Sequence, residues 1–159
     1  MESIKHIVFF LFLLLEIPAF SQQTEFGTPF IENIPYSQIS YEGELGKIEQ
    51  NAEGLLFIEN QYGVLTYDGI EWNLLRTKGE PTICKDMEGS IYVGARNFIG
   101  KIVRNEFNQF YIQSLLSDSI PLFGKVVSIE VVKGNVYFFA GKTLYKLVKG
   151  VPKKEKELP

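Results

Sequence analysis

The side chains that could do chemistry in this 159-residue chain are acids and aromatic residues, because the common nucleophile–base pairs are missing. The single histidine, His6, lies at the start of an N-terminal apolar stretch, and the single cysteine is Cys84. Serine–histidine, cysteine–histidine and histidine–metal chemistry therefore have no base or ligand in the rest of the chain. One cysteine also excludes an intrachain disulfide and a cysteine-rich zinc site, so we expect Cys84 to be a small buried core residue.

A pair of acids, Asp86 and Glu88, stands in the segment KDMEG and could in principle hold a metal or exchange protons. The matching segment QNAEG has the neutral Asn51 in place of Asp86, and calcium needs more converging oxygens than either segment supplies. In a turn before a strand, such residues usually cap backbone N–H groups. We therefore expect no metal site and no cofactor, and we predict structural turns at Gly54, Asp68, Gly69, Asp86, Gly89 and Gly134.

Aromatic and polar side chains in the predicted loops are the better candidates for ligand binding. Tyr62 and Phe98 lie between paired strands, and aromatic faces stack on the apolar faces of sugars. Arg96 and Asn97, in the same type of loop as Tyr62, could hydrogen-bond an anionic or sugar ligand, although simple surface solvation is the alternative. For Trp72 we favour packing in the core or between repeated units. The predicted ligand-binding residues are Tyr62, Arg96, Asn97 and Phe98, with an extracellular glycan or a small molecule as the partner.

The elements that position these residues are predicted to be strands. The chain is 45% hydrophobic and 14% aromatic, with 13 Phe, 8 Tyr and 14 Gly, which favours a packed all-β fold over disorder or helices. A formal net charge of −3 gives no basic surface for nucleic acid. The mixed charges near the C-terminus, at 153–157, indicate a solvated end.

A repeat organises the body of the chain. The turn glycines Gly54, Gly89 and Gly134 are each followed by a similar strand, LLFIEN, SIYVGA or NVYFFA, and then by a second strand. Linking stretches, Trp72–Arg76 and 109–115, can supply a fourth, outer strand. Four antiparallel strands at this period are typical of a β-propeller blade. We predict about three blades, near 46–76, 80–115 and 125–150, in an incomplete ring, because closed propellers have about four to eight.

The remaining segments complete the predicted domain organisation. Residues 1–21 combine Lys5, an apolar run and small residues at Ala19 and Ser21, which indicates a cleaved signal peptide and an exported, periplasmic protein. Glu16 interrupts the apolar run, so an uncleaved anchor or a buried helix is the alternative. Residues 22–45 are predicted to be an extended lead-in with a short strand near 38–41, and 151–159 to be a charged tail.

Several motifs of this sequence resemble those of the two-component regulator propellers. These are periplasmic sensor regions of hybrid histidine kinases and helix-turn-helix regulators. The resemblance rests on GTPFIEN at 27–33, Tyr41, and GVLTYDGIEW at 63–72, with the turns QNAEG and KDMEG, and it covers about residues 26–148. Two features depart from the family pattern: Gly46 stands where a tryptophan is usual, and the third unit lacks the turn aspartate.

The resemblance implies the N-terminal part of a sensor whose remaining blades, membrane helix and output domain are not in this sequence. We therefore expect a non-catalytic, ligand-binding β-propeller segment that acts in signal transduction. Two alternatives stay open. One is a fragment of a propeller-type carbohydrate-active enzyme, which would need carboxylates converging from inner strands. The other is an inert or structural truncated propeller with no ligand of its own.

Overall fold

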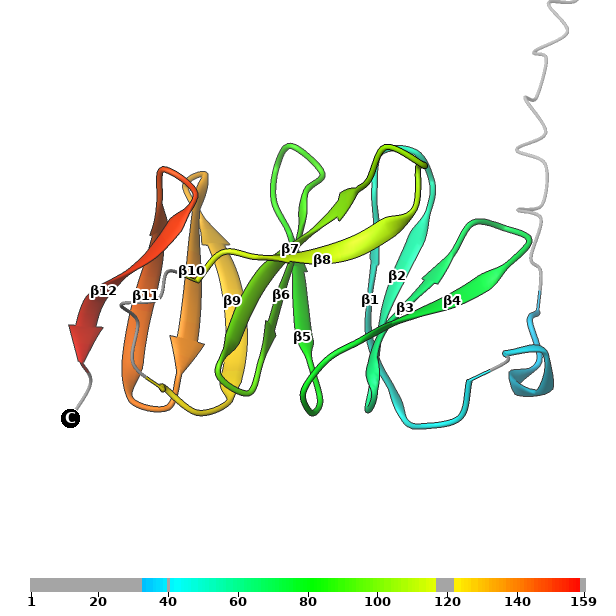
Figure 1. Cartoon of the computed structure of the whole chain (residues 1–159), viewed down its shortest axis with the longest axis horizontal. Helices are drawn as coiled ribbons and strands as arrows, with labels where there is room; N and C mark the ends of the chain where they lie inside the picture. The colour runs from blue at the N-terminus through cyan, green and yellow to red at the C-terminus, as the bar shows by residue number, and fades with distance from the viewer. Residues whose placement is uncertain (1–32, 40, 117–121, 158–159) are drawn as a thin grey trace, which may run out of the picture. The chain divides into compact units, whose positions relative to one another are not determined.

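The fold is all-β in the residues that the structure, a computed structural model, describes: 33–39, 41–116 and 122–157. Twelve strands form three four-stranded antiparallel sheets, all within the compact unit Pro35–Pro159 (Figure 1). No α-helix occurs in these ranges, where the only helical element is the short 3₁₀ turn η1 (Tyr36–Gln38). The predicted signal peptide and most of the lead-in lie outside the described residues.

In each sheet the chain runs up and down, so that strands adjacent in sequence are paired in space. The strands of the first sheet are β1 (Leu45–Gln50), β2 (Leu56–Asn60), β3 (Gly63–Tyr67) and β4 (Trp72–Arg76). The strands of the second are β5 (Thr82–Lys85), β6 (Ile91–Ala95), β7 (Phe98–Arg104) and β8 (Phe110–Ser114). The strands of the third are β9 (Val126–Val132), β10 (Asn135–Ala140), β11 (Thr143–Val148) and β12 (Val151–Glu157).

Two apolar cores hold the sheets together, one on each face of the second sheet. Because side chains alternate along a strand, β6 sends Ile91 and Val93 into the core shared with the first sheet and Tyr92 into the core shared with the third. Phe57 of the first sheet and Phe138 of the third are the largest fully buried side chains of the two cores. All of β6 is buried, as expected for a strand covered on both faces.

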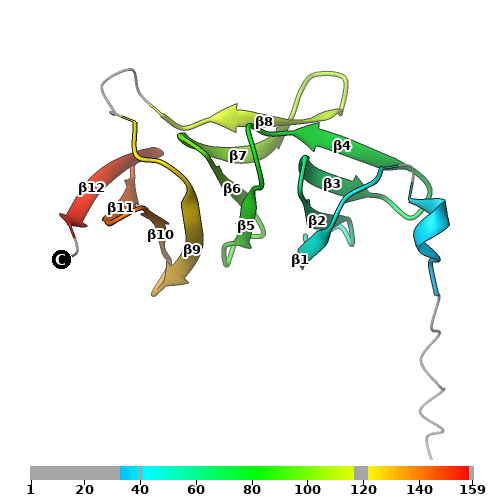
Figure 2. The same cartoon turned by 90° about the horizontal axis from the view of Figure 1, so that it is seen from below.

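The first strands of the sheets are neighbours. β5 contacts both β1 and β9, and the outer strands β4 and β8 contact each other. Figure 2 shows β1, β5 and β9 along one side of the row of sheets and β4 and β8 along the opposite side. Residues at the ends of the three first strands are therefore brought close together.

A four-residue turn recurs in the first two sheets and explains the glycine pattern. The side-chain oxygen Oδ1 of Asn51, Asp86 or Asn105 accepts two backbone N–H bonds, from the residues two and four positions later. The residue three positions after the capping residue needs a positive φ, and Gly54 and Gly89 adopt φ values of 85° and 86° there. In the turn capped by Asn105, Asn108 takes this position with a φ of 62°, and asparagine tolerates positive φ values.

The third sheet uses shorter turns, and this accounts for its missing turn aspartate. Lys133 and Gly134 have φ values of 49° and 76°, and Lys149 and Gly150 have 50° and 79°. Two successive positive φ values are typical of a two-residue type I′ hairpin turn, which needs no side-chain cap.

Two predicted segments need correction. The predicted charged tail, 151–159, contains β12, which pairs with β11 along its length and completes the third sheet. All but one of its side chains are exposed, so the strand is held by backbone pairing and has no apolar pattern. The strand predicted near 38–41 is also wrong, because η1 follows Pro35 there and no strand begins before Leu45 within the described part of the chain.

Candidate functional site

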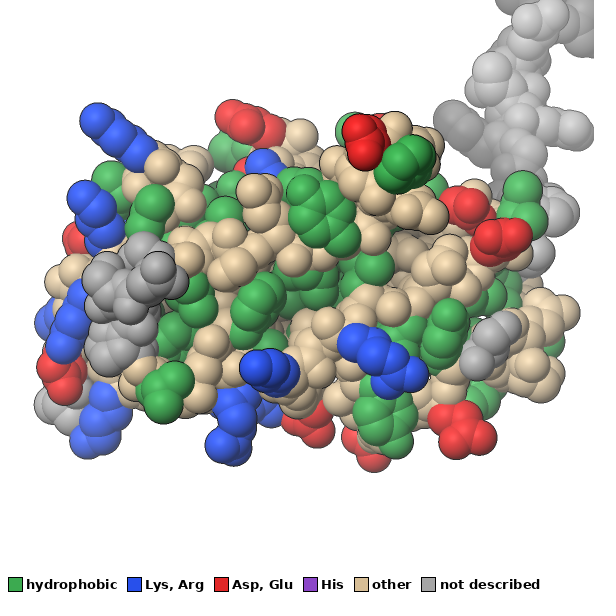
Figure 3. Space-filling view, viewed as in Figure 1, with side chains coloured by type: hydrophobic (Ala, Val, Ile, Leu, Met, Phe, Trp, Pro, Cys, Tyr) green, Lys and Arg blue, Asp and Glu red, His purple; other side chains and the backbone are tan. Residues whose placement is uncertain are grey.

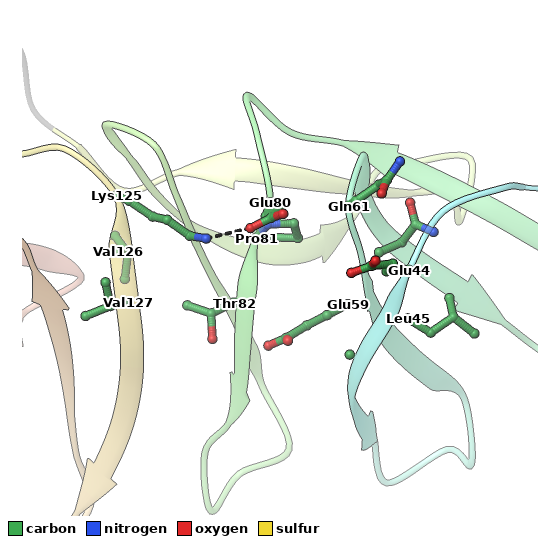
Figure 4. A pocket seen from close by; sticks show the side chains of 12 residues that line it. Glu44, Leu45, Glu59, Gln61, Glu80, Pro81, Thr82, Lys125, Val126 and Val127 are labelled. Atoms are coloured by element: carbon green, nitrogen blue, oxygen red, sulfur yellow. Dashed lines mark hydrogen bonds and ion pairs between the residues drawn. The ribbon is translucent and has the colours of Figure 1, made fainter.

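The inner pocket lies where the three first strands approach one another (Figure 4). It measures about 300 Å³. Its walls come from the start of β1, the end of β2, the segment leading into β5 and the start of β9. The lining residues are Glu44, Leu45, Gly46, Glu59, Asn60, Gln61, Glu80, Pro81, Thr82, Lys125, Val126 and Val127. All three sheets therefore contribute to one cavity.

Four charged side chains line this pocket, Glu44, Glu59, Glu80 and Lys125, and two of its three acids are already engaged. Glu59 Oε1 accepts a 2.8 Å bond from the backbone N–H of Ile83, and Oε2 accepts one of 3.2 Å from the N–H of Lys47. Glu80 forms a 2.6 Å ion pair with Lys125, which lowers the pKa of the Glu80 carboxyl. In Figure 4 Glu59 and Lys125 reach toward β5 from opposite sides. Both negatively and positively charged side chains thus line the cavity.

The outer groove lies between the outer strands β4 and β8 and measures about 770 Å³. Its only charged lining residues are the cations Arg76 and Lys78, and its remaining lining residues are Leu74, Leu75, Thr77, Asn97, Phe98, Phe110, Tyr111 and Ile112. Figure 3 shows hydrophobic side chains gathered over this side of the molecule, with basic side chains beside them. The groove is therefore more apolar than the inner pocket and differs from it in charge.

The four residues predicted to bind ligand do not form one site. Asn97 and Phe98 line the outer groove. Tyr62 is exposed, next to a residue of the inner pocket, and its carbonyl accepts a bond from the N–H of Thr77. Arg96 forms a β-bridge with Lys125 and is exposed. These residues therefore lie in or beside two different cavities and do not form one binding site.

Asn97 has a clear structural role. Its side-chain Oδ1 accepts bonds of 2.9 and 2.7 Å from the backbone N–H groups of Phe123 and Gly124, and its own N–H donates to the carbonyl of Gly124 at 2.7 Å. These bonds tie the β6–β7 turn to the segment that leads into β9. The amide oxygen of Asn97 is thus occupied by contacts between the second and third sheets.

All six predicted turn residues lie in turns, and side chains cap the backbone of every one of these turns except that of Gly134. Asp68 Oδ1 accepts from the N–H groups of Glu71 at 2.7 Å and Ile70 at 2.8 Å, and these bonds lower the pKa of the carboxyl. Asp86 caps its own turn in the way described above, and Trp72 stacks on Tyr67 with ring centroids 4.3 Å apart. Across 33–39, 41–116 and 122–157, no three His, Cys, Asp or Glu side chains are close enough to hold a metal ion.

Two groups near the sheet–sheet cores have perturbed pKa values because they are buried. Burial, assisted by the negative charge of Asp86, raises the pKa of Tyr92 to about 12. Burial also raises the pKa of the Cys84 thiol, which therefore stays protonated at neutral pH. Neither group faces the inner pocket.

The acids and the lysine of the inner pocket were missed by the sequence analysis. One signal was present: Glu59 is a carboxylate inside LLFIEN, an otherwise apolar strand, where the equivalent strands have Gly94 and Phe139. Glu80 and Lys125 lie in linking segments without any pattern, and only the packing of the sheets brings them together.

Within the described ranges, no helix has the length and apolarity needed to cross a membrane. Comparison of the chain with protein-family models, with curated proteins and with solved structures finds no match in any of the three.

Proposed function

We propose that this chain is an exported, non-catalytic ligand-binding segment of a signal-transduction regulator, and that its three sheets are consecutive blades of a β-propeller like those of two-component regulators. The observation that carries the proposal is the inner pocket, because residues from all three sheets converge on it. A ligand bound there would contact every sheet at once, and could alter how the sheets pack against one another.

The repeated architecture supports the blade assignment. Each sheet is an up-and-down meander of four strands, and the first strands lie side by side while the outer strands lie away from them. Blades of a propeller have this arrangement around a central axis. The proposal extends it to a ring that further sheets would complete.

The state of the acids favours binding over catalysis. A general acid or a nucleophile needs a carboxylate that is available to the substrate. Two of the three acids that line the pocket are engaged, because both oxygens of Glu59 accept backbone bonds and Glu80 is paired with Lys125. The third acid, Glu44, therefore lacks the second available carboxylate that hydrolysis by a pair of acids requires. The pocket instead offers acceptors and a donor close together, which suits a neutral, hydroxyl-rich ligand such as a mono- or oligosaccharide.

Calorimetric titration with a panel of neutral and uronic-acid mono- and oligosaccharides tests the proposal. We expect at least one sugar to bind the wild-type chain, and Glu80→Gln or Lys125→Met to weaken that binding about tenfold or more. Because the Glu80 and Lys125 side chains are about half exposed or more, breaking their ion pair should cost little stability, on the order of 0–1 kcal/mol.

A matched control uses an ion pair of similar length and exposure elsewhere. Lys154 and Glu157 are 2.7 Å apart on β12, away from the inner pocket. Glu157→Gln should therefore leave sugar affinity unchanged. The proposed site would be contradicted if no sugar binds the chain. It would also be contradicted if Glu157→Gln and Glu80→Gln weaken sugar affinity equally.

A further inference from the structure

The outer strands of the three sheets differ in how well their edges are protected. Each is the last strand of its sheet and has no partner on its second side within the described part of the chain. Charged residues and proline on an edge strand discourage pairing with another chain. β12 carries five charged residues and Pro152 among its seven positions, whereas β4 carries one charged residue and β8 carries none. The edges of β4 and β8, beside the outer groove, are therefore accessible to a further strand.

The backbone groups that β4 leaves free follow from its pairing with β3. The N–H of Thr77 donates to the carbonyl of Tyr62 at 3.2 Å, which continues the register of the two strands by one position. In an antiparallel pair, hydrogen-bonded and non-hydrogen-bonded positions alternate. Leu75 is therefore in the bonded class with Thr77, and Leu74 and Arg76 are in the other class. The backbone N–H and C=O groups of Leu74 and Arg76 thus point out of the sheet edge, where they are available to an added strand.

The side chains of β4 and β8 decide which residues such a strand needs. Leu75 packs against the core shared with the second sheet, so its face of β4 looks toward the outer groove. Directly opposite residues on paired strands have their side chains on the same face of the sheet. A residue opposite Leu75 would therefore enter the groove beside Phe110 and Ile112, which also pack against that core. This position of the added strand requires an apolar residue.

The charge of the outer groove selects an acidic partner. Arg76 and Lys78 are its only charged lining residues, and both are exposed. Neither forms an ion pair with another described residue. Opposite charges directly across a strand pair stabilise the pairing, whereas like charges destabilise it. The residue opposite Arg76 should therefore be aspartate or glutamate.

We propose that the outer groove and the free edge of β4 bind an extended acidic segment of a partner protein, which joins the first sheet as a fifth strand. The segment alternates acidic residues, one of them opposite Arg76, with apolar residues that enter the groove. Backbone bonds to Leu74 and Arg76 supply affinity, and the alternate side chains supply specificity. This interaction surface is distinct from the inner pocket and goes beyond the proposed function.

The edge of β8 is the alternative, and it requires the opposite bonding pattern. The N–H of Leu115 donates to the carbonyl of Ile99 at 2.9 Å, which leaves the backbone groups of Phe110 and Ile112 free. The side chains of Phe110 and Ile112 face the first sheet. A strand on β8 would therefore bond through its apolar, groove-facing residues, whereas a strand on β4 bonds through its acidic residues. β8 also offers no cation to an acidic segment.

Fluorescence anisotropy of a short labelled peptide that alternates glutamate with leucine tests the proposal on the full chain. Methylation of a backbone nitrogen removes one donor without changing the side chain. We expect the peptide to bind, and N-methylation of its glutamates to weaken binding about tenfold or more, because these residues donate to β4. The matched control is the same peptide N-methylated at its leucines, which should bind within about twofold of the parent peptide.

A charge exchange tests the role of Arg76. Arg76→Glu should weaken binding of the glutamate peptide about tenfold and should favour a peptide in which lysine replaces every glutamate. Because Arg76 is exposed, the variant is expected to fold. Lys156→Glu, an exposed lysine on the protected edge of β12, is the control and should leave the affinity for both peptides unchanged.

Each other outcome overturns the proposal. Absence of binding excludes the site, and loss of binding on N-methylation of the leucines alone places the strand on β8. Equal effects of the two N-methylations would show that the peptide does not pair with one sheet edge. If analytical ultracentrifugation shows a dimer of the chain that Arg76→Glu abolishes, a second copy occupies the edge of β4 and the proposal is again wrong.

Discussion

Glu59 of the first sheet accepts a 2.8 Å hydrogen bond from the backbone N–H of Ile83, on the free edge of the second sheet. The Lys47 ammonium donates to the carbonyl of Ile83 at 3.2 Å, so two side chains satisfy both backbone groups of one residue. An edge strand normally exposes such groups to solvent or to another strand. Side chains of the first sheet here take the place of a pairing strand: Lys47 joins β1 to β5, and Glu59 joins β2 to β5.

We predict that Glu59→Ala lowers the free energy of unfolding by about 1–3 kcal/mol, because it leaves the N–H groups of Ile83 and Lys47 without their acceptor. Urea denaturation at neutral pH measures the loss. Glu106→Ala, at an exposed turn position, is the control and should change stability by less than about 0.5 kcal/mol. Similar losses in the two variants would show that the Glu59 bonds contribute little.

Asn97 allows a second prediction that separates backbone strain from hydrogen bonding. Its φ is 52°, and its side chain accepts two bonds from the segment before β9. Asn97→Gly keeps the backbone geometry but loses the bonds, and should cost about 1 kcal/mol. Asn97→Ala adds the strain of a positive φ and should cost about 2 kcal/mol. Thermal unfolding monitored by circular dichroism gives both values, and equal costs would mean that strain is unimportant here.

The strand pattern could be predicted because apolar alternation and turn glycines coincide in the three units. The linking stretch Trp72–Arg76 forms β4 with those bounds, and the predicted 109–115 contains β8 (Phe110–Ser114). β12 was missed because an outer strand with both faces in solvent needs no apolar residues and is held by backbone bonds alone. The turn at Asn105 was missed because Asn108 stands where the other copies have glycine.

The candidate site was harder to predict than the fold for a physical reason. Its residues belong to three sheets and to two linking segments, and a sequence pattern describes only one strand at a time. Arg96 is a neighbour of Lys125 through a β-bridge between segments almost thirty residues apart, which no local periodicity indicates. Asn97 lies in the β6–β7 turn as predicted, whereas Phe98 was predicted to lie in the loop and is the first residue of β7. Both line the outer groove, and ligand binding by them stays a prediction. The bonds of Asn97 depend on the packing of two sheets.

Gly94 gives a third prediction, concerning the spacing of the second and third sheets. Its backbone needs no positive φ, but an added Cβ would approach Cγ1 of Val126 to 2.5 Å. Gly94→Ala should therefore overpack this contact and lower the free energy of unfolding by about 1–3 kcal/mol. The added Cβ would also lie 2.7 Å from the Cβ of Val126, so Val126→Gly is needed to remove every opposing side-chain atom. The double variant should therefore be more stable than the sum of the single effects predicts. Additive single effects in the four-protein cycle would contradict the proposed clash.

The last prediction concerns pH and the Asp68 turn. The carboxylate accepts two short backbone bonds, from Glu71 and Ile70, and these hold its pKa in the folded protein below the ordinary value of 3.8. A depressed folded pKa means that the unfolded chain takes up the proton first as pH falls. The stability that the charged Asp68 carboxylate contributes is therefore fully present well above pH 3.8, and it is lost as pH falls through the pKa of Asp68 in the folded protein. Asp68→Asn keeps a side-chain acceptor but cannot titrate, so the stability difference between the wild type and this variant should shrink between pH 5 and pH 2. Urea midpoints across that range measure the difference, and a difference independent of pH would show that the Asp68 bonds do not favour the charged carboxylate.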